Sequence, residues 1–371
     1  MIAIFAVVIA VAIVVGLVLH DSGRGKSLGS SVEKKLEKVV NDSMDTYNIP
    51  GAVVGVWMPG RRQWLLASGV ADIATSRPVK TTDRFRIASI TKTFTATVIL
   101  QLVDEGKLDL EASPNKYMGN EPQTAGVTIR QLLNHTSGLF DYLEDQNFLE
   151  MAEQEPLRKW QPQELLDFAF AHQPYFAPGQ SWHYSNTNYI ILGMLIEKVT
   201  GHKLQQELDS RIFKPLQLKN TSFETTPYLE GEHSEGYFET GGDRWLVTGD
   251  PSKGWASSAM VSRLDDMKVW AKALAEGHVL SPQSHQQQLQ WVPTVKDSDF
   301  RKYGLGIEYV AGLVGHEGDA FGYNCSMYYM PSTGATIVVL LNQSFDTGGP
   351  ADTITLGLAR VLFPKDLHLL H

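Results

Sequence analysis

Residues 88–103 read Ala-Ser-Ile-Thr-Lys-Thr-Phe-Thr-Ala-Thr-Val-Ile-Leu-Gln-Leu-Val. After Lys92 this run carries no charge until Asp104, and it is apolar or small on every side. A helix that is apolar all round is normally buried, so the run predicts a buried helix. Gly106 follows the first two acidic residues and predicts the helix end as a left-handed cap.

Ser89 and Lys92 are three residues apart, which places their side chains on one face of a helix. A serine hydroxyl is a weak nucleophile and needs a neighbouring base. A lysine in a dry site loses its charge easily, because desolvation disfavours the ammonium. The pair is therefore sufficient for acyl transfer. The alternative is a helix-capping serine followed by a solvated lysine, and this short motif alone leaves both interpretations open.

The composition describes a globular chain of 371 residues, with 43% hydrophobic and 20% charged residues. A net charge of −9 argues against nucleic acid as a partner. Cys325 is the single cysteine, so an intrachain disulfide and a cysteine-rich metal site are excluded. We interpret Cys325 as a small buried hydrophobe. No metal and no organic cofactor is expected.

Residues 2–19 contain eighteen uncharged, mostly aliphatic side chains, about enough to span a bilayer. The run lacks a basic leader and a small-x-small cleavage site, which favours an uncleaved membrane anchor over a cleaved signal peptide. We therefore assign residues 1–20 to an anchor or signal, and the Gly- and Ser-rich residues 21–31 to a tether. Basic residues after the run would hold the following chain in the cytoplasm, whereas the chemistry argued below places it outside.

The order of predicted elements is a helix, a hairpin of two strands, a long helical middle, then more strands and a closing helix. The first helix covers residues 32–47, and the last covers residues 352–362. This order predicts an α/β protein whose antiparallel sheet is built from both ends of the chain, with a helical region inserted between.

Two further polar phrases precede apolar helices or turns. The phrase Asn134-His135-Thr136-Ser137-Gly138-Leu139 contains a histidine that could serve as a base, but side-chain to backbone bonds that fix a turn explain it better. The second phrase is Tyr184-Ser185-Asn186, just before the apolar helix 190–201. Its tyrosine can act as an acid or base and its amide can bind a carbonyl. The alternative is a helix cap beside a packed aromatic ring.

Other hydrolase signatures are absent from the sequence. No G-x-S-x-G nucleophile elbow occurs. His316-Glu317 has Ala320 where the zinc-protease helix needs its second histidine.

Taken in order, Ser89-x-x-Lys92, Tyr184-Ser185-Asn186 and His316-Glu317-Gly318 resemble the motifs of the serine penicillin-recognising enzymes. The branch that the chain resembles comprises class C β-lactamases, secreted D-alanyl-D-alanine carboxypeptidases and family VIII esterases, and the resemblance runs over most of residues 35–363. It implies an α+β sandwich of the β-lactamase/transpeptidase type, with an antiparallel sheet flanked by helices and an inserted all-helical domain. The expected catalytic domain is 32–363, with a sheet subdomain at about 32–88 and 220–363 and a helical subdomain at about 89–219.

The resemblance also implies roles for individual residues. Ser89 would be the acylated nucleophile, Lys92 would take or relay its proton, and Tyr184 would act with Lys92 and then protonate the leaving group. Asn186 would hold the substrate amide, and His316 would line the cleft on the edge strand. Gly318 would let the substrate backbone approach. The backbone N–H groups of Ser89 and Asp319 would form the oxyanion hole.

One departure from the family pattern bears on the substrate. Efficient β-lactamases of this branch carry lysine where this chain has His316, and a neutral histidine pairs more weakly with a substrate carboxylate. Glu317 and Asp319 could raise the proton affinity of His316, face water, or repel anionic substrates.

The leading expectation is a membrane-tethered, extracytoplasmic D-alanyl-D-alanine carboxypeptidase-like peptidase that works through an acyl-enzyme on Ser89. The alternatives are a carboxylesterase, a D-amino-acid peptidase, a weak β-lactamase, or a non-catalytic penicillin-recognition module. The expected partner is a small peptide or ester, with β-lactams as further ligands and residues 2–19 in the membrane; the sequence leaves the oligomeric state open.

Overall fold

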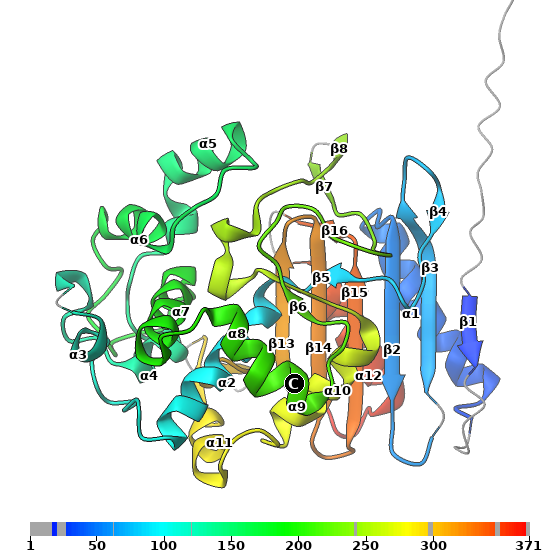
Figure 1. Cartoon of the computed structure of the whole chain (residues 1–371). Coiled ribbons are helices and arrows are strands. Elements are labelled where there is room, and N and C mark those ends of the chain that lie inside the picture. The colour runs from blue at the N-terminus through cyan, green and yellow to red at the C-terminus, as the bar shows by residue number, and fades with distance from the viewer. Residues whose placement is uncertain are drawn as a thin grey trace, which may run out of the picture.

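An antiparallel sheet forms the middle of the molecule, and helices cover both of its faces (Figure 1). The structure is a computed structural model that describes residues 17–20, 27–61, 63–119, 121–240, 243–295, 300–345 and 349–368. The α/β class with an antiparallel sheet, expected from the order of elements, is confirmed.

The main sheet joins strands from the two ends of the chain. Its strand order is β1-β3-β2-β15-β14-β13-β12-β11-β10, with β4 paired to β3, and all of its pairs are antiparallel. Strands β2 and β15 pair with each other, so the N-terminal hairpin β2–β3 and the C-terminal hairpin β14–β15 form one continuous sheet. The bounds are β1 Leu17–His20, β2 Gly51–Trp57, β3 Trp64–Asp72, β4 Arg77–Pro78, β10 Val292–Pro293, β11 Arg301–Tyr303, β12 Glu308–Val310, β13 Leu313–Ala320, β14 Tyr323–Met330 and β15 Ala335–Leu341.

The helices divide between the two faces of this sheet. Helices α1 and α12 pack on one face, and α2, α7 and α10 contribute to the core on the other. Figure 1 shows the helices α2 to α9 gathered beside the sheet. The bounds are α1 Ser30–Thr46, α2 Thr91–Asp104, α3 Asn115–Met118, α4 Ile129–Leu133, α5 Gln146–Gln154, α6 Pro162–Phe170, α7 Asn186–Thr200, α8 Leu204–Leu208, α9 Lys214–Leu216, α10 Leu264–Ala275, α11 Pro282–Gln288 and α12 Ala351–Leu362.

Alternating strand residues supply the two cores. Val53 of β2 belongs to the core beneath α2, whereas its neighbour Val54 belongs to the core beneath α1. Successive side chains of a strand point to opposite faces, so a strand with both faces covered is apolar throughout. Every residue of β2, β14 and β15 is buried accordingly.

Helix α2 is buried as its apolar sequence predicts, and it ends at Asp104 with Gly106 at φ +70°. Its ring Phe94 stacks on Trp270 of α10 with ring centroids 4.1 Å apart. Trp270 also donates from Nε1 to Thr93 Oγ1 at 2.8 Å. These contacts anchor α2 from behind, so its first turn presents Ser89 and Lys92 at a fixed position.

Two small sheets complete the structure. One has the order β5-β9-β6, with β5 Phe85–Arg86, β6 Ser222–Phe223 and β9 Met260–Ser262. The other has the order β16-β7-β8, with β7 Tyr237–Thr240, β8 Asp243–Leu246 and β16 Gln343–Ser344. Strand β5 delivers the chain directly to Ser89.

The predicted membrane anchor falls mostly outside the described residues, which begin at residue 17. Residues 17–19, its last three, lie in strand β1 and pair with β3, so they give no support to a spanning helix. Among the residues that the structure describes, none of the helices combines the length and the apolar character needed to cross a bilayer.

Candidate active site

Ser89 lies in a short 3-10 turn, Ala88–Ile90, immediately before α2. Ala88 has φ +44°, a left-handed conformation that is unfavourable for a residue with a Cβ. Such strain persists only where the surroundings enforce it, and it occurs often at active sites. The sharp turn separates the Ser89 side chain from the buried body of α2.

The Lys92 ammonium site is completely enclosed. Its Nζ lies 2.9 Å from Ser89 Oγ, 2.8 Å from Asn186 Oδ1 and 3.2 Å from the backbone oxygen of Ser257. Burial lowers the pKa of Lys92 to about 7, against the opposing charges of Asp141 and Glu308. Near neutral pH, the protonated and neutral forms of Lys92 are therefore present in comparable amounts. The neutral form is the one that can act as a base for Ser89.

Asn186 is the first residue of α7, and Asp141 holds its amide in place. Asn186 Nδ2 donates to Asp141 Oδ2 at 2.8 Å, while its Oδ1 faces Lys92. Burial raises the pKa of Asp141, although hydrogen bonds from Asn186 and Leu143 oppose the rise. A continuous buried chain thus runs from Asp141 through Asn186 and Lys92 to Ser89. Asp141 stands outside all three sequence motifs, so the sequence analysis missed it.

Tyr184 covers the same lysine from another side. Its ring centroid lies 4.8 Å from Lys92 Nζ. Burial raises the pKa of Tyr184 well above its usual value, although a hydrogen bond with Ser89 opposes the shift. The phenol therefore keeps its proton at neutral pH and can donate it to a leaving group.

His135 is fully buried beneath Tyr184, and the two rings stack with centroids 4.3 Å apart. Its Nδ1 accepts hydrogen bonds from the Ser185 N–H at 3.1 Å and from Asn188 Nδ2 at 3.2 Å. Burial lowers the pKa of His135 well below its usual value. The imidazole is therefore neutral with its proton on Nε2, and its contacts hold the loop that carries Tyr184, as the turn-fixing interpretation expects.

His316, on β13, has both ring nitrogens engaged within the protein. Nδ1 contacts the backbone oxygen of Glu317, and Nε2 lies 2.8 Å from Tyr303 Oη. Burial lowers the pKa of His316, and this effect outweighs the charge of Glu308 4.0 Å away. The alternative in which Glu317 and Asp319 raise its proton affinity is wrong, because burial lowers the pKa of His316 and the opposing carboxylate is that of Glu308. The imidazole is neutral, with Nδ1 as the donor.

Gly318 lies against the turn that carries Ser89. A Cβ at this position would lie 2.7 Å from Ser89 N and 2.7 Å from the Ile87 backbone oxygen. The glycine is thus required by the close approach of the protein's own backbone. Asp319 follows on the same strand, and its carboxylate accepts from the Phe345 N–H at 3.3 Å.

These groups open into a cavity of about 500 Å³. Strand β12 pairs with β13 only as far as Gly315. The next residues of β13, from His316 to Asp319, line the cavity. The lining residues are Ser89, Trp182, Tyr184, Thr294, Val295, Arg301, Glu308, His316, Glu317, Gly318, Asp319 and Gly349. The structure thus brings Ser89, Lys92, Tyr184 and Asn186 into one cluster, with His316, Gly318 and Asp319 along the adjoining strand.

Among the described residues that line this cavity, Arg301 is the one lysine or arginine, and three carboxyl groups surround it. Its guanidinium lies 3.0 Å from Glu317, 3.4 Å from Glu308, and in contact with Asp352. Burial and the neighbouring Asp352 raise the pKa of Glu317 well above its usual value. Within the described part of the chain, no group of three or more His, Cys, Asp or Glu side chains is arranged to hold a metal ion.

Comparison with known proteins places this geometry in context. The beta-lactamase family profile matches residues 36–360. Penicillin-binding protein 4* of Bacillus subtilis (strain 168) is 29% identical over 301 residues, which cover 75% of this chain and 65% of that protein. The chain spans 64–65% of the length of the first two curated relatives that it matches.

Two solved structures resemble the whole catalytic region. A D-stereospecific amidohydrolase from Streptomyces sp. shares 30% identity at a TM-score of 0.78, covering 90% of this chain and 98% of that one. A D-amino acid amidase from Ochrobactrum anthropi SV3, in complex with D-phenylalanine, shares 27% identity at a TM-score of 0.79, covering 90% and 99%.

Proposed function

The chain belongs to the beta-lactamase family of serine hydrolases, and on that premise we propose that it cleaves an amide bond on the carbonyl side of a D-amino acid residue through an acyl-enzyme on Ser89. The observation that carries the proposal is the buried chain from Asp141 through Asn186 and Lys92 to Ser89. A binding module has no need for a nucleophile beside a lysine whose pKa is about 7.

The proposed reaction begins with proton transfer from Ser89 to neutral Lys92. The Ser89 Oγ then bonds to the substrate carbonyl carbon, and backbone N–H groups at Ser89 and Asp319 stabilise the oxyanion. The C–N bond breaks as the amine leaves, and the proton taken by Lys92 reaches that amine through Tyr184. Water then attacks the ester carbonyl and gives a proton to the same pair. The ester C–O bond breaks, that proton passes to Ser89 Oγ, and the free acid leaves.

The charge at the cavity favours substrates that carry an amine. Arg301 is surrounded by Glu308, Glu317 and Asp352, and His316 is neutral with both nitrogens engaged. A substrate carboxylate would therefore find no uncompensated cation among the described residues that line the cavity, whereas the carboxyl oxygens there can accept hydrogen bonds from a substrate ammonium. The two solved relatives, a D-stereospecific amidohydrolase and a D-amino acid amidase, support the same class.

The second candidate is a D-alanyl-D-alanine carboxypeptidase. It is favoured by the similarity to penicillin-binding protein 4* and by Arg301, whose partly exposed guanidinium lines the cavity. An extracytoplasmic location is part of this candidate, because cell-wall peptides lie outside the membrane. Esterase activity remains compatible with either candidate, since short acyl esters are intrinsically easy to cleave.

The test is a matched pair of substrates that differ in the position of charge. D-Alanyl-D-alanine amide has a free amine and no carboxylate, whereas N-acetyl-D-alanyl-D-alanine has a carboxylate and no amine, and cleavage between the two residues expels an α-amine in both. We expect kcat/KM for that cleavage to be higher by at least about tenfold for the amide, with its L-alanyl counterpart poorer still. A preference for the acetylated acid would establish the carboxypeptidase instead.

Ser89→Ala is the control for both substrates, and the rate that remains in this variant should approach the uncatalysed rate. Intact-protein mass after incubation with penicillin provides an independent readout. An adduct that is absent in Ser89→Ala would identify the nucleophile, and hydrolysis retained by Ser89→Ala would refute the assignment. No hydrolysis by the parent protein, of esters or of amides, would favour a non-catalytic module.

A further inference from the structure

Lys92 Nζ has two oxygen acceptors besides Ser89 Oγ. They are Asn186 Oδ1 at 2.8 Å and the backbone oxygen of Ser257 at 3.2 Å. A neutral amine has two N–H donors and one lone pair. When these two oxygens accept both donors, the lone pair faces Ser89 Oγ, which lies 2.9 Å away. The Ser257 carbonyl therefore helps to orient the base, and the contacts that fix this carbonyl bear on the reaction.

The Ser257 carbonyl belongs to a short 3-10 turn, Trp255–Ser257, whose backbone is hydrogen-bonded to neighbouring elements. Thr95 of α2 donates from Oγ1 to the backbone oxygen of Ala256 at 2.8 Å. Just before the turn, the backbone oxygen of Lys253 accepts from Tyr142 Oη at 2.6 Å. The turn is therefore held against α2, the helix that carries the lysine.

Trp255 begins this turn in a conformation that is unfavourable for a residue with a Cβ. Its φ is +35°, and such a conformation persists only where the surroundings enforce it. The indole packs against Gly193 within α7, where a Cβ would lie 2.8 Å from the ring and 2.5 Å from Ala256 Cβ. Helix α7 thus accepts the ring and the turn at this distance because residue 193 has no side chain.

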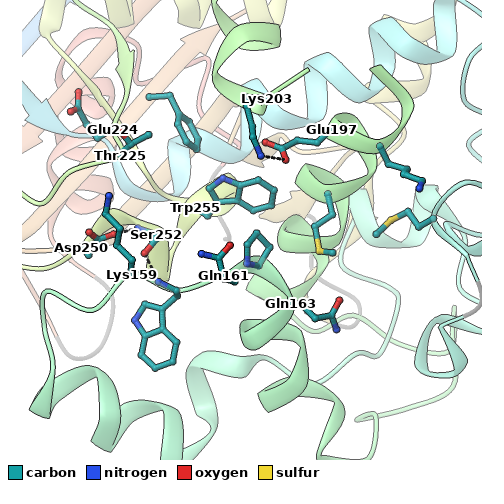
Figure 2. A pocket seen from close by; sticks show the side chains of 16 residues that line it. Lys159, Gln161, Gln163, Glu197, Lys203, Glu224, Thr225, Asp250, Ser252 and Trp255 are labelled. Carbon is teal, nitrogen blue, oxygen red and sulfur yellow. Dashed lines mark hydrogen bonds and ion pairs between the residues drawn. The ribbon is translucent and has the colours of Figure 1, made fainter. Parts of the chain in front are cut away.

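Helix α7 is linked to both acceptors of Lys92. Asn186 is its first residue, and Gly193, two turns later, contacts Trp255. Figure 2 shows the indole between Glu197, which also lies on α7, and Gln161. The ring is partly buried and lines a cavity of about 680 Å³, which shares no lining residue with the cavity at Ser89. Trp255 can therefore act on the reaction only through the turn.

We propose that Trp255 is a positioning residue for the base Lys92. Its indole, packed against Gly193, holds the turn that presents the Ser257 carbonyl. The inference rests on the proposed function, in which Lys92 takes the proton of Ser89. Without the indole, the contact that enforces the left-handed φ is lost, so the turn relaxes and its carbonyl moves away from the lysine. The lone pair is then no longer directed at Ser89, and proton transfer slows.

A fluorophosphonate tests the base without depending on the natural substrate. Ser89 Oγ bonds to phosphorus, fluoride leaves, and Lys92 takes the hydroxyl proton. Intact-protein mass at several probe concentrations gives the dissociation constant KI, the maximal rate kinact and the labelled fraction, with Ser89→Ala and Lys92→Met as backgrounds. At pH 9 most of Lys92 is neutral because its pKa is about 7, so kinact there reports the orientation of the lysine.

Trp255→Ala should lower kinact by at least about tenfold, with KI changed by less than about twofold and labelling still complete. Trp245→Ala is the matched control, because Trp245 is a half-exposed tryptophan on β8, and it should leave kinact unchanged. A kinact of Trp255→Ala equal to that of the parent would overturn the proposal. Poor folding would instead lower the labelled fraction, and the next variant then decides.

Gly193→Ala disturbs the same contact from the side of α7. Its Cβ would displace the indole and the turn, so kinact should again fall by at least about tenfold. Gly357→Ala is the matched control, because Gly357 also lies within a helix, α12, where a Cβ would lie 2.7 Å from Val39 Cγ1. It should leave kinact unchanged. Equal losses in the two glycine variants would refute the specific role of the contact.

This inference and the proposed function fail in different ways. If the parent cleaves neither D-alanyl substrate but its labelling slows in Trp255→Ala and Gly193→Ala, the proposed amide cleavage is wrong and the positioning role stands. If the parent cleaves the D-alanyl amide while both variants are labelled at the parent's rate, the positioning role is wrong and the proposed function stands. A parent that is not labelled at Ser89 would overturn the inference, whatever its hydrolytic activity.

Discussion

Asn186 donates from Nδ2 to Asp141 Oδ2 at 2.8 Å, and this contact fixes the amide whose oxygen faces Lys92. In the proposed mechanism, Asp141 thereby acts on the nucleophile Ser89 through Asn186 and Lys92, although its own side chain does not touch Ser89. The carboxylate also stabilises the charged form of Lys92, since its Coulombic effect raises the pKa that burial lowers. Asp141 is thus a positioning residue that also tunes the base.

The first prediction concerns the pH dependence of hydrolysis. If neutral Lys92 is the base, kcat/KM rises with pH through about 7, the pKa of Lys92, and then levels off. Lys92→Arg should reduce kcat by at least about 10²-fold at every pH, because a guanidinium cannot be deprotonated in a protein. A pH–rate profile that is flat from pH 5 to 9 would contradict this role.

Replacement of Asp141 by Asn should move that profile. The amide can still accept the hydrogen bond from Asn186, but it removes the negative charge that raises the pKa of Lys92. The acid limb of kcat/KM should therefore shift to lower pH. The control is Glu150→Gln, an exposed charge on α5 that should leave the limb in place. Equal behaviour of the two variants would refute the electrostatic role of Asp141.

The buried lysine should also be visible in stability. The pKa of Lys92 is about 7 in the folded protein and 10.5 in the reference state, so the unfolded chain binds more protons between these values. The contribution of Lys92 to stability is therefore least favourable at pH 7 and below, and it rises with pH. Relative to Lys92→Met, which has no titrating group here, the parent should gain roughly 3–5 kcal/mol between pH 7 and 10.5.

Urea unfolding of the parent and of Lys92→Met across this pH range measures the difference directly. Titrating groups that do not interact with Lys92 cancel between the two proteins, and the pKa values of its neighbours His135 and His316 are shifted away from the window from pH 8 to 10.5. A difference that is constant with pH over that window would therefore show that the pKa of Lys92 is not lowered in the folded protein.

His135 should support Tyr184 through its acceptor nitrogen. His135→Phe keeps an aromatic ring against Tyr184 but leaves the Ser185 N–H without its acceptor. We expect a loss of about 1–3 kcal/mol in unfolding free energy. We also expect kcat to fall more than KM changes, because the loop carrying Tyr184 is displaced.

His172→Phe provides the comparison, since His172 stacks on Phe140 with centroids 4.0 Å apart but is partly exposed and remote from Ser89. Its effect on kcat should be small. If the two variants reduced kcat equally, the specific role of His135 would be excluded.

Arg301 should contribute more stability at neutral than at acid pH. Arg301→Gln removes the cation that opposes the raised pKa values of Glu317 and Asp352, so the folded state would favour the protonated forms of these two groups more strongly. Carboxyl groups with raised folded pKa values lose stability as pH increases above their unfolded values near 4. The destabilisation should therefore be small at pH 4 and about 2–4 kcal/mol at pH 7.

Arg263→Gln serves as the reference, because its pair with Asp265 is exposed and should be worth less than about 1 kcal/mol. Thermal or urea unfolding at the two pH values decides the matter. A penalty for Arg301→Gln that is the same at pH 4 and pH 7 would contradict the predicted charge coupling.

Local sequence patterns specify the secondary structure around Ser89. The uncharged run after Lys92 predicted a buried helix, and Gly106 predicted its end, because both depend on local periodicity and backbone freedom. The order of strands and helices likewise predicted the antiparallel sheet, and the short polar phrases located Ser89, Lys92 and Tyr184 as candidates.

The contacts that surround Lys92 and His316 come from segments that are remote in sequence, so only the tertiary fold specifies them. Asp141 reaches Asn186 across 45 positions in sequence, and Tyr303 engages His316 from another strand. Burial, helped by the charges of Lys92 and Arg301, lowers the pKa of His316 against the nearby carboxylate of Glu308 that would raise it. These outcomes depend on solvent exclusion and on distances between segments that are remote in the chain, which local sequence patterns do not encode.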